Sequence, residues 1–493
     1  MASQTLREAR KFEEVFGKTI LPEERPAFHL SPLHGWMNDP NGFSIYQGKY
    51  HLFYQYYPYD SVWGNMHWGH AVSEDLLHWE YLPAALAPDE QYDYDGCFSG
   101  SAFTLRDGTH LLMYTGVRLE RTGDGRRHEV QTQCLALGDG FEYEKYAGNP
   151  VLNEYDLPEG ASRADFRDPK IIALNGEEMV ALIGSRNAEG DGQILMYKST
   201  DGFSWTYWRK LAENNGRFGR MWECPDFFKL DGKWVLLTRP QDMLPAGFEY
   251  HNGNGTLCLI GSFDTETGEF TQEHDQAIDY GIDFYAPQTV LTPDGRRVMI
   301  GWMQNWDSCS IRETGEKWAG QMSLPRELFI RDGRLYQWPI REIEALRKEE
   351  VFHAGVLKNE QIELEEINGR MLDMELEIEP VNGEEIFHRF SVWFALDDLY
   401  HTAISYRPHE KTLKVDRKFS GSRRAIIHQR RAKVETREGK LSLRMIFDRY
   451  SVEIFINGGE QVMSAALYTP VSADRIRFRA DGAVSVRVKK WAL

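Results

Sequence analysis

Three carboxylic acids hold similar places along this chain. Asp39, Asp168 and Glu223 each stand just before a run of mostly apolar residues that leads to a glycine-containing turn. Glycosidic bonds are broken by such acids: one protonates the leaving oxygen, and another attacks carbon or activates water. The acids lie nine residues before Gly48, eight before Gly176 and nine before Gly232. Three acids nearly in register predict chemistry on a glycosidic bond.

These acids have two other possible uses. A single Asp or Glu before a strand often serves a turn by accepting backbone N–H bonds. Three carboxylates that converge repel one another, which function explains better than structure does. Metal binding is the other use, but the nearby His51, His67 and His70 do not follow the spacing of metal ligands. We therefore expect neither a metal ion nor another cofactor.

The acids belong to a repeat of about 60 residues. In each copy, two mostly apolar strands flank a turn that contains glycine, and Asp-Gly or Asn-Gly pairs favour tight hairpins. A polar turn leading to an aromatic residue recurs at Ser73–Trp79 and Ser199–Trp205. Five copies of a four-stranded unit predict a five-bladed β-propeller, and unrelated hairpins in a sandwich are the alternative. The turn glycines are Gly48, Gly108, Gly176, Gly232 and Gly295.

The pattern changes after residue 338. Ile340, Ile343 and Leu346 suggest a short helix, and strict alternation of apolar residues follows over 372–378 and 441–447. Such alternation indicates half-buried antiparallel strands, so we expect an all-β chain that ends in a C-terminal β-sandwich. The expected domains are a helical extension over 1–27, the propeller over 28–338, a linker helix over 339–354 and the β-sandwich over 355–493.

Composition narrows the partners and the compartment. The net charge of −18 repels nucleic acid, and the aromatic content of 13% suits sugar faces but also suits β proteins in general. No apolar run approaches the ~20 residues of a membrane span, and the N-terminus lacks a signal-like apolar segment. The five cysteines form no C-x-x-C pair. We expect a cytoplasmic protein that acts on a small carbohydrate, without nucleic acid or membrane partners.

At these acids the sequence resembles glycoside hydrolase family 32, which includes invertases, fructanases and sucrose-6-phosphate hydrolases. The resemblance runs in order from about 28 to 338 and continues weakly into the sandwich. Each motif alone is weak, but the ordered set is specific. The matching segments are Trp36-Met-Asn-Asp39-Pro-Asn-Gly42, Phe98-Ser-Gly-Ser101, Phe166-Arg-Asp168-Pro169, Trp222-Glu223-Cys224-Pro225-Asp226, Tyr285-Ala-Pro-Gln288 and Leu324-Pro-Arg-Glu327.

The resemblance implies a retaining hydrolase that releases terminal β-D-fructofuranosyl units. Asp39 is implied as the nucleophile, Glu223 as the acid/base and Asp168 as the residue that holds fructose hydroxyls. Retention predicts carboxyl groups of Asp39 and Glu223 about 5–5.5 Å apart. Arg167 should keep Asp168 ionised, a neighbouring carboxylate should raise the pKa of Glu223, and Cys224 is expected as a small buried residue.

The same resemblance implies the residues that bind substrate. Trp residues in this set have core packing as their alternative role, because aromatic residues on strands are usually buried. A rim formed by Tyr59, Asp60 and Trp306 is a weaker expectation. The expected substrate-binding residues are Trp36, Asn38, Gln55, Trp63, Phe98, Ser99, Arg167 and Trp302.

Other activities and several substrates fit the same residues. A fructosyltransferase, a catalytically inactive sugar-binding propeller and an inverting hydrolase of arabinans or xylans are the alternatives. Sucrose, sucrose 6-phosphate and short fructans are all candidate substrates. Residues 406–440 hold 12 Lys/Arg and 4 Asp/Glu. Its Arg423-Arg424 and Arg430-Arg431 pairs suggest either phosphate binding or a strand edge guarded by charge. A homo-oligomer formed through the β-sandwich is a further hypothesis.

Overall fold

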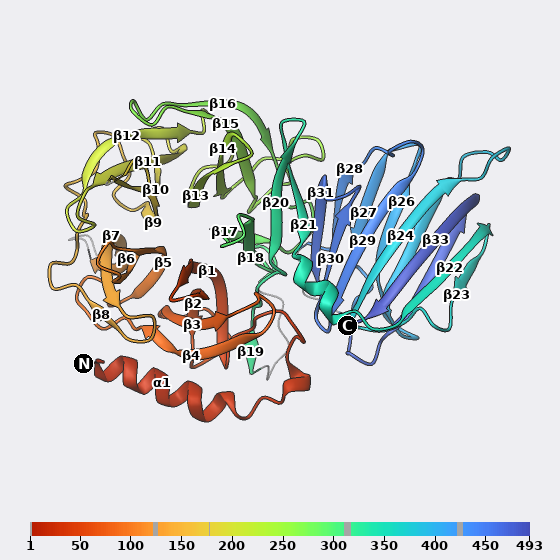
Figure 1. Ribbon diagram of the computed structural model, residues 1–493, viewed down its shortest axis with the longest axis horizontal. Helices are drawn as coiled ribbons and strands as arrows, with labels where there is room; N and C mark the ends of the chain where they lie inside the picture. The colour runs from red at the N-terminus through yellow and green to blue at the C-terminus, as the bar shows by residue number, and fades with distance from the viewer. Residues whose placement is uncertain (1, 122–126, 177, 310–316, 422–426) are drawn as a thin grey trace.

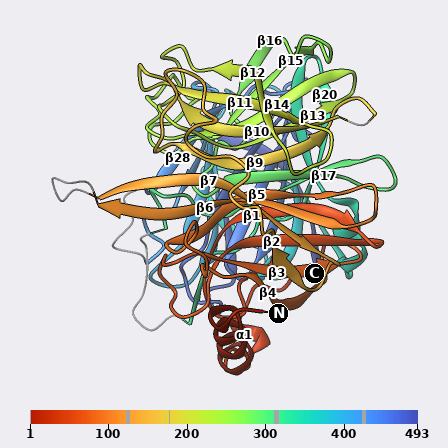
Figure 2. The same ribbon diagram turned by 90° about the vertical axis from the view of Figure 1, so that its left-hand side faces the viewer.

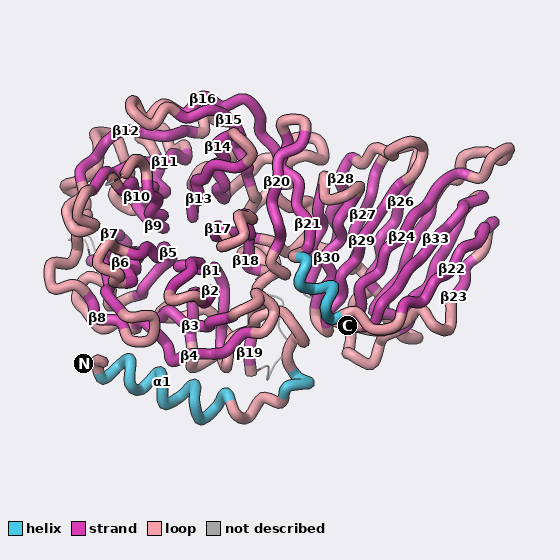
Figure 3. Tube along the Cα trace, in the orientation of Figure 1, coloured by secondary structure: helices cyan, strands magenta, loops and turns pink. Residues whose placement is uncertain are grey.

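A computed structural model describes residues 2–121, 127–176, 178–309, 317–421 and 427–493. The chain begins with helix α1 (Gln4–Gly17) and the 3-10 turn η1 (Pro22–Glu24). Five small sheets follow, and two larger sheets end the chain (Figure 1). Strands dominate the described residues, and helix is confined to α1, η1 and η2 (Figure 3). The expected all-β fold class is confirmed.

Within the described residues, β1–β21 form five sheets, each of four or five strands. The first holds β1 (Gly35–Tyr46), β2 (Lys49–Tyr57), β3 (His67–Ser73), β4 (Trp79–Leu86) and β19 (Trp318–Ala319). The second holds β5 (Gly96–Thr104), β6 (His110–Arg121), β7 (Arg127–Gly138) and β8 (Tyr143–Lys145). The third holds β9 (Phe166–Ala173), β10 (Met179–Arg186), β11 (Gly192–Ser199) and β12 (Thr206–Glu213).

The remaining two sheets repeat this plan. The fourth holds β13 (Trp222–Leu230), β14 (Lys233–Pro240), β15 (Leu257–Phe263) and β16 (Phe270–Gln276). The fifth holds β17 (Tyr285–Leu291), β18 (Arg297–Trp302), β20 (Arg326–Arg331) and β21 (Arg334–Pro339). Strands β1, β5, β9, β13 and β17 each contact the next, and β17 contacts β1, which closes a ring. The result is a β-propeller with these five strands innermost (Figure 1).

Two local features shape the propeller. Asp231 and Gly232 have φ angles of 47° and 83°, the left-handed pair that a tight hairpin between β13 and β14 requires. Strand β19 pairs in parallel with β1, so a segment from the end of the propeller completes its first sheet. Hairpin β6–β7 extends beyond the rest of the propeller (Figure 2). The hairpin turns and the closed ring together place the first residues of all five inner strands at the same end of the propeller.

The C-terminal part is a sandwich of two six-stranded sheets. One has the order β22 (Glu350–Lys358), β33 (Ala483–Ala492), β24 (Leu372–Pro380), β29 (Leu441–Asp448), β30 (Ser451–Ile456) and β31 (Gln461–Ala466). The other has the order β23 (Gln361–Glu363), β32 (Arg475–Asp481), β25 (Arg389–Leu396), β26 (Thr402–Arg407), β27 (Thr412–Asp416) and β28 (Gln429–Lys433).

The connecting segments differ in detail from expectation. The linker forms a 3-10 helix, η2 (Arg341–Leu346), but β22 begins at Glu350, so the last residues of the expected linker are strand. Helix α1 is capped by Ser3, and the buried Glu13 carboxylate accepts the N–H of Ala84 at 2.8 Å. That bond fixes α1 against the first sheet of the propeller. Among the described residues, no helix has the length and apolarity needed to cross a membrane.

A buried charged cluster joins the propeller to the sandwich. His29 lies between Asp448 at 2.8 Å and Glu453 at 3.0 Å, and both carboxylates are fully buried. Arg326 also contacts Glu453, and it reaches Asp279 at 3.0 Å. Burial alone would lower the pKa of His29, but its two carboxylate partners raise that pKa to about 9. The imidazolium is therefore a structural cation at neutral pH.

The charge of His29 makes interdomain stability depend on pH. Because the folded pKa of about 9 exceeds the ordinary value of 6.5, the stabilisation is complete below pH 6.5 and is lost as pH rises through 9. His29→Gln should lower the free energy of unfolding near pH 7 by about 3–5 kcal/mol, because it leaves buried carboxylates uncompensated. The gap from wild type should narrow towards pH 10. Chemical denaturation from pH 6 to 10 measures both effects.

His78→Gln is the matched control, since His78 pairs with Asp75 on the exposed surface. It should change stability little. A gap between His29→Gln and wild type that stayed constant up to pH 10 would contradict a charged His29.

Candidate active site

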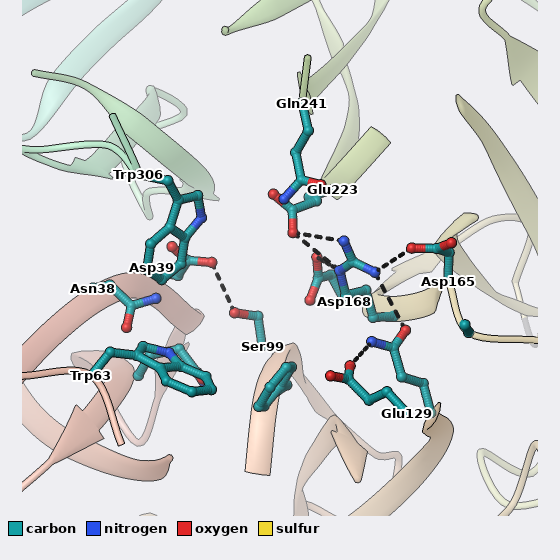
Figure 4. A pocket seen from close by; sticks show the side chains of 15 residues that line it. Asn38, Asp39, Trp63, Ser99, Glu129, Asp165, Asp168, Glu223, Gln241 and Trp306 are labelled. Atoms are coloured by element: carbon teal, nitrogen blue, oxygen red, sulfur yellow. Dashed lines mark hydrogen bonds and ion pairs between the residues drawn. The ribbon is translucent and has the colours of Figure 1, made fainter. Parts of the chain in front are cut away.

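The inner strands enclose one end of a pocket of about 440 Å³ (Figure 4). A pocket of this size accommodates a small ligand rather than a polymer segment. The side chains lining it come from the first four sheets and from the loop after β18. They are Asn38, Asp39, Gln55, Trp63, Phe98, Ser99, Glu129, Gln131, Ala164, Asp165, Arg167, Asp168, Glu223, Gln241 and Trp306.

Each inner strand has a β-bulge at the pocket. In three of them the bulged residue has a positive φ and precedes proline: Asp168 (66°), Cys224 (40°) and Ala286 (60°). Positive φ is uncommon for residues with a Cβ and is held here by the surrounding sheet. A bulge interrupts the regular alternation of side chains. Neighbouring residues can therefore both present groups to the pocket.

The bulges correct the alignment drawn from the sequence. Counting from turn glycines placed Asp39 and Glu223 at one repeat position, and this is wrong. Glu223 pairs with Arg239 and stands just before its bulge, the place that Met37 holds in β1, two residues before Asp39. The count failed because the β1–β2 hairpin is one residue pair longer than β13–β14, and because β1 has a second register shift between Asn41 and Ser44.

Asp39 is buried with one of its oxygens unpaired. Its Oδ2 accepts bonds from the Ser99 hydroxyl at 3.0 Å and the Cys224 thiol at 3.5 Å, and Arg239 lies 3.5 Å away. Its Oδ1 has no hydrogen-bond partner among the described residues. Buried polar atoms are normally paired, so an exception demands an explanation. Asp39 itself lines the pocket, and the contacts to Oδ2 hold its carboxylate in one orientation there, as a nucleophile requires.

Asp168 is held by backbone groups. Its Oδ2 accepts the N–H of Cys224 at 3.0 Å, and its own N–H donates to Thr115 at 2.9 Å. Burial, followed by the nearby charge of Glu223, raises the pKa of Asp168 to about 6. Arg167 and Arg239 oppose that shift. Asp168 therefore changes its charge within the range where enzymes work.

Glu223 lies between a cation and a phenol. Its Oε1 accepts two bonds from Arg167, at 3.1 and 3.0 Å, and its Oε2 accepts one from the Tyr285 hydroxyl at 2.8 Å. Arg239 lies 4.4 Å from the centre of the Tyr285 ring, which fixes that ring from behind. These contacts fix the orientation of the Glu223 carboxyl group at the pocket.

Arg167 has a different partner from the one expected. The sequence suggested that it keeps Asp168 ionised, yet its Nε lies 4.0 Å from Asp168 and 3.1 Å from Glu223. The bulge explains this, because Arg167 and Glu223 are both the residues just before a bulged position on adjacent strands. Arg167 also reaches Asp165 at 3.1 Å. The Arg167 guanidinium therefore pairs mainly with Glu223, and it only partly offsets the rise in the pKa of Asp168.

Cys224 is placed to donate rather than to react. Its side chain is buried, and burial raises the pKa of its thiol well above the ordinary value. The protonated thiol donates to Asp39. This agrees with the expectation of a small buried residue and gives it a positioning contact.

Six of the eight expected substrate-binding residues line the pocket, but two do not. Trp36 and Trp302 are almost fully buried, because Trp306 covers both of them. Trp306 stacks on Trp36 at 6.5 Å and meets Trp302 at 5.1 Å. They support the pocket wall instead of forming it. Of the weaker rim candidates, Trp306 lines the pocket, whereas Tyr59 and Asp60 are not among its lining residues.

Sequence reasoning missed four polar lining residues and one cation behind them. Glu129 and Gln131 alternate along β7, and Asp165 stands two residues before Arg167, so period-2 polarity in these strands was an available signal. Nothing in the sequence indicated Gln241. Arg239 is fully buried without a lining role, and no pattern distinguished it.

The propeller and this cluster of acids define a glycoside hydrolase. In the described residues no group of three His, Cys, Asp or Glu side chains is arranged to hold a metal ion. The chain belongs to glycosyl hydrolase family 32: the model of its N-terminal domain matches residues 29–339, and that of its C-terminal domain matches residues 342–492.

Curated relatives and solved structures agree with this assignment. The chain is 38% identical to the raffinose invertase of Escherichia coli, over 92% of each chain. It is 36% identical to the sucrose-6-phosphate hydrolase of Escherichia coli, over 97% of this chain and 95% of the relative. A mutant GH32 β-fructofuranosidase of Bombyx mori in complex with sucrose superposes with a TM-score of 0.83 at 36% identity, covering 99% of this chain and 98% of that one.

The raised pKa of Asp168 predicts an acid limb in the rate of glycoside hydrolysis. Below pH 6 Asp168 gains a proton and loses the charge that would stabilise a cationic transition state, so kcat/KM should fall as pH drops through about 6. Asp168→Asn should lower kcat/KM by about 10²–10³-fold and abolish that limb. The pH dependence of kcat/KM from pH 4 to 9 measures both.

Asp165→Asn is the matched control, because Asp165 lines the pocket but binds Arg167 and Arg186. It should retain the limb near pH 6. An acid limb centred near pH 4 in the wild type would show that Asp168 does not control it.

Proposed function

We propose that this protein is a β-fructofuranosidase that removes terminal, non-reducing β-D-fructofuranosyl units with retention of configuration. Asp39 is the nucleophile, Glu223 the acid/base and Asp168 the residue that holds the sugar. The observation that carries the proposal is that Asp39, Asp168 and Glu223 all line one pocket. Sucrose and short β-fructans are the proposed substrates.

In the first step a glycosidic bond is exchanged for an ester. A carboxylate oxygen of Asp39 attacks the anomeric carbon C2 of the fructosyl unit while the C2–O bond to the leaving sugar breaks. Glu223 gives its proton to the departing oxygen, so the leaving sugar departs as a neutral alcohol. Ser99, Cys224 and Arg239 all lie against Oδ2 of Asp39. These contacts fix the orientation of the Asp39 carboxylate in the pocket.

In the second step water releases fructose. Glu223, now a carboxylate, takes a proton from water, whose oxygen attacks C2 and displaces Asp39. The bonds from Arg167 and Tyr285 keep the Glu223 carboxyl group in place between the two steps. Asp168 accepts hydrogen bonds from hydroxyl groups of the sugar and stabilises positive charge on the ring in both transition states. Two displacements at C2 restore the original configuration.

Charge in the pocket favours a neutral leaving group. Of its described lining residues, five are carboxylates and Arg167 is the single cation. Asp165 is matched by Arg167 and Arg186, but among the described residues Glu129 is bonded only by the amide of Gln131. A phosphate dianion on the leaving sugar would meet this field and be repelled. We therefore place sucrose ahead of sucrose 6-phosphate as substrate.

The proposed compartment is the cytoplasm. Cys97, Cys134, Cys224 and Cys258 are buried free thiols, which suits a reducing compartment. Imported sugars would be its substrates there. Association of copies through the β-sandwich remains a prediction at this stage.

Substrates with different leaving groups distinguish the role of Asp39 from that of Glu223. Asp39→Ala should lower kcat/KM by at least about 10⁴-fold on every β-fructofuranoside, because no ester can form. Glu223→Ala should cost about 10²–10⁴-fold on sucrose but much less on an aryl β-D-fructofuranoside, whose phenolate leaves without a proton. Steady-state kinetics on both substrates measure the contrast, with Asp226→Asn as a control outside the pocket lining.

Turnover of sucrose by Asp39→Ala at a rate near that of wild type would disprove the nucleophile. Proton NMR of the first product gives a second check. Initial release of α-fructofuranose would mean inversion and would exclude the double displacement.

Discrimination against phosphate is also measurable. Wild-type kcat/KM should be at least about tenfold higher on sucrose than on sucrose 6-phosphate, and added salt should reduce the ratio. Glu129→Gln should narrow the ratio by removing one repelling charge. Glu120→Gln is the matched control, since Glu120 lies on the same hairpin outside the pocket lining and pairs with Arg118 and His128. A higher kcat/KM on sucrose 6-phosphate would refute the role given to Glu129.

A further inference from the structure

The β-sandwich has four strand edges, and three of them are protected. The edge of β31 is covered by the propeller, whose Tyr280 and Ile282 N–H groups donate to Val462 and Ser464. The edge strand β23 has only three residues. Edge strands that are long and uncharged pair readily with other chains, so proteins usually shorten, charge or cover them.

The positively charged side chains of β28 protect the third edge. Strand β28 has the sequence Gln-Arg-Arg-Ala-Lys, and Arg430 also binds Asn252 of the propeller. The basic stretch thus lies on a sheet edge, as one of the two sequence interpretations held. Its other arginine pair, Arg423-Arg424, lies outside the described residues.

The fourth edge, β22, lacks these protections. β22 runs for nine residues, pairs with β33 along one side, and has no described strand along the other. Between Glu350 and Lys358 it contains no proline and no charged carboxylate, ammonium or guanidinium group. Phe352 and Val356 are 58% and 56% exposed. An apolar edge of this length is a template for another strand.

The sequence of β22 is complementary to itself. In an antiparallel pair about a twofold axis at Ala354, opposite charges meet at both ends and apolar side chains meet between them. His353 of each copy would face Gly355 of the other, which has no side chain to clash with it. The facing pairs are Glu350 with Lys358, Val351 with Leu357, Phe352 with Val356, His353 with Gly355, and Ala354 with its own copy.

We propose that β22 is a homodimer interface, in which two copies of this chain pair their β22 strands antiparallel about Ala354. Two six-stranded sheets then become one continuous twelve-stranded sheet across the dimer. Such an interface is isologous, because one patch contacts its own copy. Strand β22 lies at the end of the sandwich farthest from the propeller (Figure 1). Both pockets therefore stay open in the dimer.

The register gives the proposal a specific test. Ala354 is exposed, and it alone faces itself across the axis. Ala354→Lys or Ala354→Glu should place like charges opposite each other and weaken dimerisation about fivefold or more. An equimolar mixture of the two variants should recover dimers, because Lys then faces Glu. Sedimentation velocity over a range of concentrations distinguishes 57.1 kDa monomers from dimers.

Controls separate dimerisation from folding. Leu399→Glu introduces a charge at an equally exposed site, 77% accessible, on a loop of the other sheet, and should leave the dimer unchanged. Activity on sucrose should stay at the wild-type level in every variant, since β22 lies outside the pocket lining. Hydrogen exchange of the wild type should slow in residues 350–358 as concentration rises.

Three results would overturn the proposal. They are a wild type that stays monomeric at all concentrations with exchange in β22 unaffected, an Ala354→Lys variant that dimerises as well as wild type, and a Lys/Glu mixture that stays monomeric. The last would reject the axis at Ala354 in particular.

Discussion

The compensation of buried negative charge is the constraint on which this structure depends. Asp39, Asp168 and Glu223 meet in one pocket, and their repulsion must be offset by the two buried guanidinium groups of Arg167 and Arg239. Although burial alone would lower it, the surrounding carboxylates raise the pKa of each arginine. An uncompensated charge in such a place costs several kcal/mol, so the cations are as necessary to the centre of the propeller as the acids are.

The same solution recurs where the two domains meet. Asp448 and Glu453 of the sandwich are neutralised by His29 and Arg326, which come from the segment before the first blade and from the last blade. Each of these partners is fully buried. The beginning and the end of the propeller are thus both bonded to the sandwich. A ring whose first and last parts are held in this way keeps its inner strands, and hence the pocket, in fixed positions.

Backbone irregularity gives the pocket its chemistry. A regular strand sends alternate side chains to opposite faces, so adjacent residues could not serve one site. Bulges at Asp168 and Cys224 relax that rule: Arg167 and Asp168 both reach the pocket, and Cys224 contacts Asp39 from the position next to Glu223. The sandwich shows the opposite use of strand regularity. Its edges are covered, short or cationic except at β22, where an unbroken strand exposes an apolar row.

The sequence by itself determined the repeat, the all-β fold and the acids, because turn glycines and alternating apolar residues are local signals. It could not determine the register between blades, since one extra residue near Gly42 shifts the count. Nor could it show which arginine pairs with which acid, or that Trp306 covers Trp36 and Trp302. Those facts depend on contacts between strands far apart in the chain. Burial and pairing of charge arise only when the ring closes, so tertiary structure alone decided them.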